Sequence, residues 1–123
     1  AEGLVFVYPT WWYSLPAMLK GWLDRVLVPY DTFEIKPGLH PVVAKLDNIR
    51  LVGGISTYGS PDWWIRWIIG DPGRKVILRG VRPICARRCR TFWLGLYLMD
   101  SCPEDRRKAF LDRVDRLATG LPA

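Results

Sequence analysis

The segment YPTWWYS, residues 8–14, is the part of the sequence best suited to holding a ligand. Trp11, Trp12 and Tyr13 stand together after an apolar run, where a turn ordinarily uses small or polar residues. Their rings offer flat surfaces for stacking, and the amide groups of a turn that opens a helix favour negative charge. These features indicate a site for a flat aromatic ligand, and packing between subunits is the alternative use of the same rings.

A second candidate segment, STYGSP at residues 56–61, carries hydroxyl groups, a glycine and a tyrosine. Like the first segment, it follows an apolar run typical of a buried strand. In open parallel sheets, ligands bind beyond the carboxyl ends of the strands, where the strand order reverses. We therefore expect the loops 9–15 and 56–61 to lie at one edge of a sheet and to share a ligand.

Other chemistry-bearing residues form no recognisable site. The three cysteines lack C-x-x-C spacing, and the single histidine, His40, lies in a distant polar loop, so no metal site or disulfide framework is predicted. Reduced, mostly buried thiols in an intracellular protein are expected instead. The pair Gly53-Gly54 lies inside a predicted strand rather than before a helix, so it is not a dinucleotide-binding motif. There is no convincing catalytic triad or carboxylate pair.

The elements that must position the two loops alternate between strand and helix. Apolar runs predict strands at residues 4–8, 49–55 and 91–99. Pro16 and helical spacing predict a helix that Pro29 ends, and a long connection follows at residues 30–48. This order predicts one α/β domain over residues 1–123, with a parallel sheet covered by helices on both faces.

Two further helices are predicted from their first residues. Ser60-Pro61-Asp62 has the chemistry of a helix start, and glycines and prolines at residues 70–73 interrupt the helix. Ser101 and Glu104 form a capping box for the last helix. That helix is expected to bury five side chains: Phe110, Leu111, Val114, Leu117 and Ala118.

Charge and aromatic content suggest a second class of function. The net charge is +6, and residues 63–99 hold eight basic side chains against one acid, Asp71. Arginines interleaved with Trp67 and Trp93 could stack on bases, so a nucleic-acid or acidic-surface binding module is an alternative. Five tryptophans are otherwise expected in the core or an interface: Trp22, Trp63, Trp64, Trp67 and Trp93. The longest apolar stretch, residues 92–99, is too short to cross a bilayer.

The stretch YPTWWYSLPAMLKGWLDRV resembles the signature of the flavodoxin-like NAD(P)H dehydrogenase (quinone) family. In that family a Pro-x-x-Trp-aromatic turn follows the third strand and leads into Pro-Ala-x-Leu-Lys-Gly-Trp. STYGSP, GDPGR and LYLMD resemble the bacterial members, so the resemblance covers essentially the whole chain. It implies a flavodoxin-like three-layer α/β sandwich of which strands 3, 4 and 5 are present. The N-terminal strands 1 and 2 and the phosphate-binding loop are expected to be missing from these residues.

The resemblance also implies a function. It implies a flavin, FMN or FAD, which is reduced by NADH or NADPH and passes the hydride to a quinone or similar acceptor. The cofactor-binding residues it implies are Pro9, Thr10, Trp11, Trp12, Tyr13, Ser56, Thr57, Tyr58 and Gly59. Backbone amides near Trp12 would face the edge of the flavin ring, while the aromatic rings form the wall beside it. No catalytic side chain and no metal are assigned.

The expected setting follows from the same family. It implies a homodimer in the cytoplasm, with a membrane potassium-efflux system as a further partner at the inner face of the membrane. A nucleic-acid partner is not expected, because the sequence contains no recognised nucleic-acid-binding motif. Because the phosphate-binding loop is not among these residues, activity of this chain by itself is doubtful, and a non-catalytic fragment is the other alternative.

Overall fold

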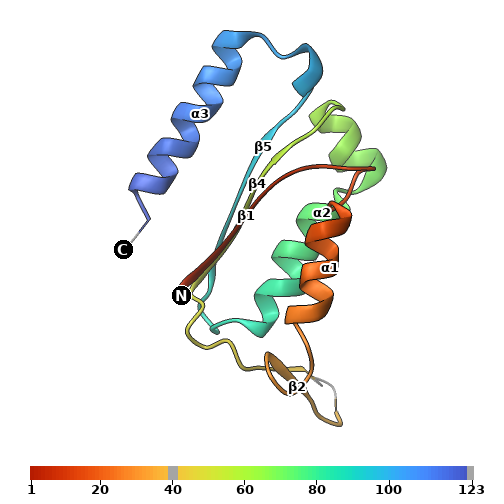
Figure 1. The fold of residues 1–123 in the computed structure, drawn as a ribbon, viewed down its shortest axis with the longest axis vertical. Helices are drawn as coiled ribbons and strands as arrows, with labels where there is room; N and C mark the ends of the chain where they lie inside the picture. Colours follow the sequence, from red (N-terminus) through yellow and green to blue (C-terminus); the bar gives the residue numbers. More distant parts are fainter. Residues whose placement is uncertain (39–41, 122–123) are drawn as a thin grey trace.

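Three parallel strands form the centre of the computed structural model, which describes residues 1–38 and 42–121 (Figure 1). They are β1 (Gly3–Pro9), β4 (Leu51–Thr57) and β5 (Arg90–Leu96), in the order β1-β4-β5. Both pairings run unbroken over seven residues, from the row Gly3, Leu51 and Arg90 to the row Pro9, Thr57 and Leu96. The predicted parallel sheet is therefore confirmed. His40 lies outside the described residues.

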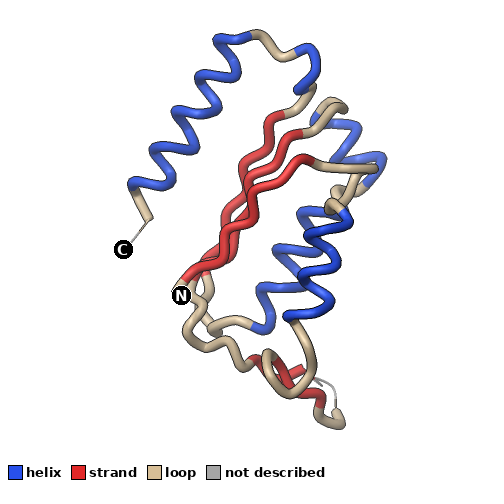
Figure 2. Tube along the Cα trace, in the orientation of Figure 1, coloured by secondary structure: helices blue, strands red, loops and turns tan. Residues whose placement is uncertain are grey.

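Helices cover both faces of this sheet, as predicted (Figures 1 and 2). One face carries α1 (Ala17–Val26) and α2 (Pro72–Lys75), the other α3 (Glu104–Thr119). Two π-helical segments, Trp64–Ile69 and Val76–Val81, flank α2, and a short 3-10 turn at Arg82–Ile84 follows them. The predicted interruption at residues 70–73 is present, because Gly70 and Asp71 both adopt positive φ, 85° and 49°.

The connection between α1 and β4 contains a small antiparallel pair that the sequence did not reveal. The strands β2 (Phe33–Ile35) and β3 (Val42–Ala44) hold three residues each. Runs this short carry too little periodicity to be distinguished from loop.

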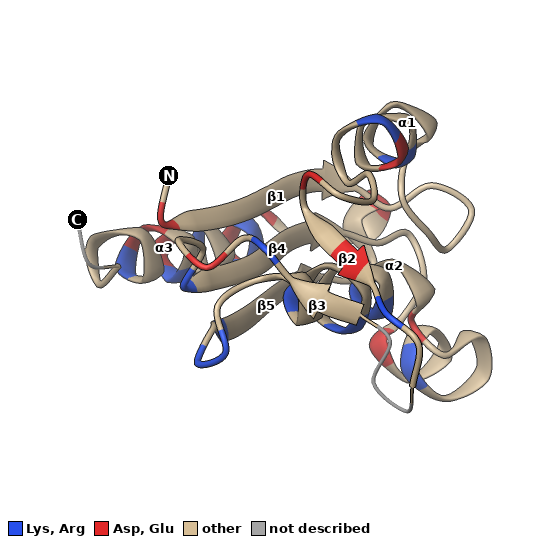
Figure 3. Ribbon diagram, turned by 90° about the horizontal axis from the view of Figure 1, so that it is seen from below, with Lys and Arg blue, Asp and Glu red and all other residues tan. Residues whose placement is uncertain are grey.

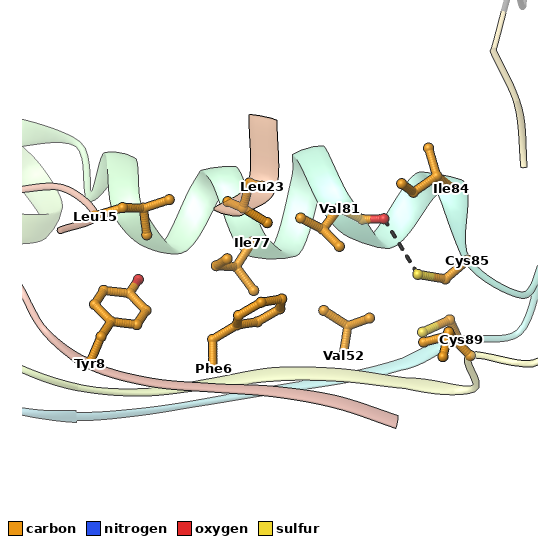
Figure 4. Close-up of a cluster of buried hydrophobic side chains, with 11 residues drawn as sticks. Phe6, Tyr8, Leu15, Leu23, Val52, Ile77, Val81, Ile84, Cys85 and Cys89 are labelled. Atoms are coloured by element: carbon orange, nitrogen blue, oxygen red, sulfur yellow. Dashed lines mark hydrogen bonds between the residues drawn. The ribbon is translucent and has the colours of Figure 1, made fainter. Parts of the chain in front are cut away.

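The main core lies between the sheet and the helices α1 and α2 (Figure 4). Phe6 and Val52 from the strands meet Leu23 from α1 and Ile77 from the segment after α2. Cys85 and Cys89 lie at the end of this core near the start of β5, and all three cysteines are buried and free, as expected. Burial, together with the neighbouring Cys89, raises the pKa of the Cys85 thiol to about 11, so this thiol is a poor nucleophile at neutral pH.

The two glycines in β4 make room for aromatic rings of the neighbouring strand. A Cβ on Gly53 would lie 2.2 Å from the ring of Phe92, and one on Gly54 would lie 2.2 Å from the ring of Trp93. The rings therefore lie directly against the backbone of β4, one on each face. This packing is the structural reason for a glycine pair in the central strand.

Three sequence predictions about the C-terminal part are wrong. Ser101 does not cap α3: the residue before the helix is Pro103, no side chain caps it, and the Ser101 hydroxyl donates instead to the carbonyl of Leu98 at 3.4 Å. The strand predicted to reach residue 99 ends at Leu96, because Leu98 turns the chain with a φ of 55°. Of the five apolar side chains expected to be buried by α3, only Phe110 is fully buried, and Leu111 is 63% exposed.

Two of the five tryptophans expected in the core or an interface are exposed, and the basic residues do not form one patch. Trp63 and Trp67 are 58% and 82% exposed, so they are not core residues of this chain. Four basic side chains of residues 66–79 surround one cavity, whereas Arg88 and Arg90 line another at the amino end of the sheet. Figure 3 shows the basic segments spread over separate elements. In the described residues, no helix is long and apolar enough to span a membrane.

Candidate ligand-binding site

A cavity of about 330 Å³ lies at the carboxyl edge of the sheet, where β1 and β4 end. The two loops predicted from the sequence form it together. Its lining residues are Thr10, Trp11, Trp12, Tyr13, Tyr58, Gly59, Ser60 and Ile65. The structure thus brings together six of the nine predicted site residues.

The turn after β1 has an unusual backbone. Trp11 and Ser14 exchange two backbone hydrogen bonds, of 3.1 and 2.9 Å, around the central residues Trp12 and Tyr13. Both central residues have positive φ, 45° and 63°. Left-handed backbone costs a non-glycine residue about 1–3 kcal/mol, and such strain gathers at functional sites. Glycine or asparagine would adopt this backbone with less strain than Trp12 and Tyr13 do. The presence of two aromatic residues here therefore indicates a functional role for their rings.

Hydrogen bonds between the two loops fix their spacing. The amide of Thr10 donates to the carbonyl of Thr57 at 2.9 Å, and the hydroxyls of Thr10 and Ser56 lie 2.9 Å apart. Ser56, which is almost fully buried, also donates to the carbonyl of Tyr8 at 2.8 Å. The predicted residues Pro9, Ser56 and Thr57 do not line the cavity, and they act instead as supports for the loops that do.

Backbone amide groups around the cavity remain available. Within the described part of the chain, the N–H groups of Trp12, Tyr13, Gly59 and Ser60 donate to no backbone carbonyl. The side chain of Trp12 is 91% exposed and that of Trp11 62% exposed. The cavity therefore offers aromatic surface and several free donors at once, which suits a flat heterocycle with acceptor atoms along one edge.

A buried polar network supports the cavity from below. The hydroxyl of Tyr58 donates to a carboxylate oxygen of Asp71 at 3.2 Å and accepts from the indole N–H of Trp93 at 3.1 Å. The ring of Tyr58 stacks on Tyr97 with centroids 4.6 Å apart. Burial raises the pKa of Asp71, whereas the Tyr58 hydroxyl and Arg74 oppose that rise. Burial also raises the pKa of Tyr58, so this hydroxyl stays protonated as a donor.

Sequence reasoning missed Ser60 and Ile65 in the lining and Asp71 beneath it. Ser60 lies in the predicted ligand loop 56–61 but was interpreted as a helix start rather than as a cofactor-binding residue, and it lines the cavity. Asp71 lies 13 residues after Tyr58, and only the left-handed turn at residues 70–71 folds it back under the loop. The signal that could have shown this turn was the sequence GDPG at residues 70–73.

An open parallel sheet with a ligand-sized cavity between two neighbouring strand ends is typical of the α/β folds that bind nucleotides and flavins. The chain belongs to the flavodoxin-like fold family, whose family model matches residues 1–64.

Individual relatives agree with this assignment. An "Uncharacterized NAD(P)H oxidoreductase" of Haemophilus influenzae is 59% identical over 114 residues, which are 91% of this chain and 54% of that protein. An "FMN-dependent NADH:quinone oxidoreductase" of Beijerinckia indica is 35% identical over 78 residues, 61% of this chain and 37% of that protein. The chain thus spans about half the length, or less, of these curated relatives.

The crystal structure of Smu.1420 from Streptococcus mutans shares the fold. It superposes with a TM-score of 0.83 at 24% identity, covering 98% of this chain and 61% of that chain. The three-layer flavodoxin-like architecture expected from the sequence is therefore confirmed.

Proposed function

We propose that this chain contributes the flavin-ring side of an NAD(P)H-dependent oxidoreductase site, with FMN or FAD as cofactor and a quinone-like acceptor. The observation that carries the proposal is the cavity at the carboxyl edge of the sheet, with its exposed rings and free amides. The relatives support it, because their names describe NAD(P)H and FMN-dependent quinone oxidoreductases.

The residues present fit a flavin. Trp11, Trp12 and Tyr13 would lie beside the ring system, and free amides at Trp12 and Gly59 would face its polar edge. A bound flavin accepts and returns a hydride, and the negative charge that this leaves is stabilised by oriented N–H groups. The reductant and the acceptor would use the exposed side of the cavity in turn, which requires positioning rather than a side-chain acid or base. No catalytic side chain is assigned.

Replacing Trp12 with glycine separates the two roles of this residue. The change removes the ring and relieves the positive φ, so we expect flavin affinity to fall about tenfold while stability stays equal or rises by about 1 kcal/mol. Quenching of flavin fluorescence on titration with FMN and with FAD measures the affinity, and urea unfolding measures the stability.

The matched control is Trp67→Gly, because Trp67 is also highly exposed and lies outside this cavity. Its flavin affinity should not change. If both variants lose affinity equally, or if Trp12→Gly leaves flavin affinity unchanged, the proposed site is wrong.

We also propose that the protein forms a homodimer through α1. Met18, Trp22 and Val26 follow one another at four-residue spacing and are 89%, 43% and 40% exposed, so they form an uncovered apolar stripe on this helix.

Met18→Glu is expected to shift sedimentation toward the monomer. Leu111→Glu, at another exposed apolar position on α3, should leave the dimer intact, and a monomeric unchanged protein would contradict the proposal.

A further inference from the structure

A second cavity, of about 360 Å³, lies at the outer edge of β5. It shares no lining residue with the cavity described above. The stacked pair Tyr58 and Tyr97 separates the two, because Tyr58 lines the first cavity and Tyr97 lines the second. Nothing in the proposed oxidoreductase chemistry uses this second cavity.

Four arginines converge on this cavity from both layers of helices. Arg66 lies on the π-helical segment before α2 and Arg74 lies on α2 itself. Arg106 and Arg113 come from α3, where a spacing of seven residues places them on one face. Since α2 and α3 cover opposite faces of the sheet, their arginines can meet only around its edge (Figures 1 and 3).

The positive charge of the cavity is only partly compensated. Asp62 is the one acidic side chain in the lining, and it pairs with Arg66. Among the described residues, Arg74, Arg106 and Arg113 form no ion pair. Four guanidinium groups and one carboxylate line the hollow, and the neighbouring Asp71 also interacts with Arg66 and Arg74. The lining still carries an excess of positive charge, an arrangement that attracts anions.

A buried hydroxyl adds a neutral donor. Tyr97 is only 9% exposed, and its hydroxyl forms no hydrogen bond of good geometry in the described part of the chain, although the guanidinium of Arg66 lies close enough to interact with it. The ring folds back over Gly95, where a Cβ would lie 2.8 Å from the hydroxyl oxygen. The absence of a side chain at Gly95 therefore permits this placement, and both residues line the cavity. A buried hydroxyl whose one polar neighbour is a guanidinium can still donate its proton to a ligand in the cavity.

We propose that the cavity binds an oxyanion carried by a small organic molecule, with a phosphate monoester as the preferred form. Arginine pairs with phosphate through two parallel hydrogen bonds, and a dianion matches the excess of positive charge better than a carboxylate does. The volume is within the range of small-molecule sites, so it leaves room for the organic part beside Trp93.

Phenyl phosphate, benzoate and phenol test this proposal, because they share a ring and differ in charge. The indole N–H resonance of Trp93 reports binding in a nuclear magnetic resonance titration of the protein, since Trp93 lines the cavity. We expect saturable binding of phenyl phosphate that weakens with added salt, binding of benzoate about tenfold weaker, and none of phenol. Benzoate binding as tight as phenyl phosphate would overturn the phosphate preference, and equal binding of phenol would overturn the anion site.

Variants on exposed positions keep the test independent of folding. The double change Arg106→Gln and Arg113→Gln should weaken phenyl phosphate binding at least about tenfold, because it removes two of the four guanidinium groups. Arg107→Gln is the matched control, because Arg107 is exposed on the same helix but does not line the cavity. This variant should bind phenyl phosphate as tightly as the unchanged protein.

Asp62→Asn provides a change of opposite sign. It removes the carboxylate that repels an anion and frees Arg66, so phenyl phosphate should bind several-fold more tightly. Unchanged affinity in the double arginine variant, or equal losses in that variant and Arg107→Gln, would overturn the proposal.

Discussion

Replacing Gly54 with alanine is expected to lower the free energy of unfolding by about 1–3 kcal/mol, the usual cost of overpacking a core. The new Cβ would lie 2.2 Å from the ring of Trp93, so the ring must move. Trp93 cannot move freely, because its indole N–H donates to Tyr58 and its ring packs edge-on against Tyr8. The change should therefore also disturb the floor of the candidate ligand site. Urea unfolding followed by circular dichroism measures the loss.

The same substitution at Gly21 is the control. A Cβ at Gly21, in the middle of α1, meets no atom within 4 Å. Alanine there restricts the unfolded chain and favours the helix, so stability should rise by about 0.5–1 kcal/mol. Equal effects of the two substitutions would show that the ring of Trp93 is not held against β4.

Replacing Tyr58 with phenylalanine is expected to cost about 3 kcal/mol near neutral pH, because it leaves two buried groups without their partner. These groups are the indole N–H of Trp93 and a carboxylate oxygen of Asp71. Tyr97→Phe is the matched control: Tyr97 stacks on Tyr58, but the one polar neighbour of its hydroxyl is the half-exposed Arg66, so its removal should cost much less stability.

The loss in Tyr58→Phe should depend on pH. Burial raises the pKa of Asp71 above 3.8, so the stability that its neutral form contributes is present below that value and is lost as the pH rises through the folded-state pKa. The Tyr58 hydroxyl lowers this pKa by favouring the carboxylate. Without it the pKa rises further, and the variant loses more stability than the unchanged protein between acid and neutral pH. Thermal unfolding at pH 3 and pH 7 checks this, and an equal loss at both would contradict it.

Much of the fold followed from simple patterns. The central strand β4 is a continuous apolar run because helices cover both of its faces, and this arrangement leaves a plain signal in the sequence. The strand β1 has the same pattern, although Val5 and Val7 on its second face are 42% and 72% exposed here. The placement of the candidate site followed as well, since the loops after neighbouring parallel strands must meet at one edge.

The features that escaped prediction depend on contacts between distant residues. Leu111 has the periodicity of a core residue, but α3 packs on the sheet through Phe110 and turns Leu111 to the outside. The left-handed backbone at Trp12 and Tyr13 contradicts the local preference of those residues, so no propensity could reveal it. Asp71 and Tyr97 likewise depend on Tyr58, which is distant in sequence: it donates a hydrogen bond to Asp71 and stacks on Tyr97.

The parallel arrangement of the sheet bears on how quickly the chain can fold. Gly3 pairs with Leu51 and Leu51 pairs with Arg90, so the neighbouring strands are 48 and 39 residues apart along the chain. Closing a flexible loop of that length costs about 3 kcal/mol of chain entropy before the pairing repays any of it. Folding of such topologies is slower than that of helical bundles of similar size. We expect the helix-forming segments between the strands to form early and shorten these loops, and we expect the joining of β1 and β4 around the core of Phe6, Val52 and Ile77 to limit the folding rate.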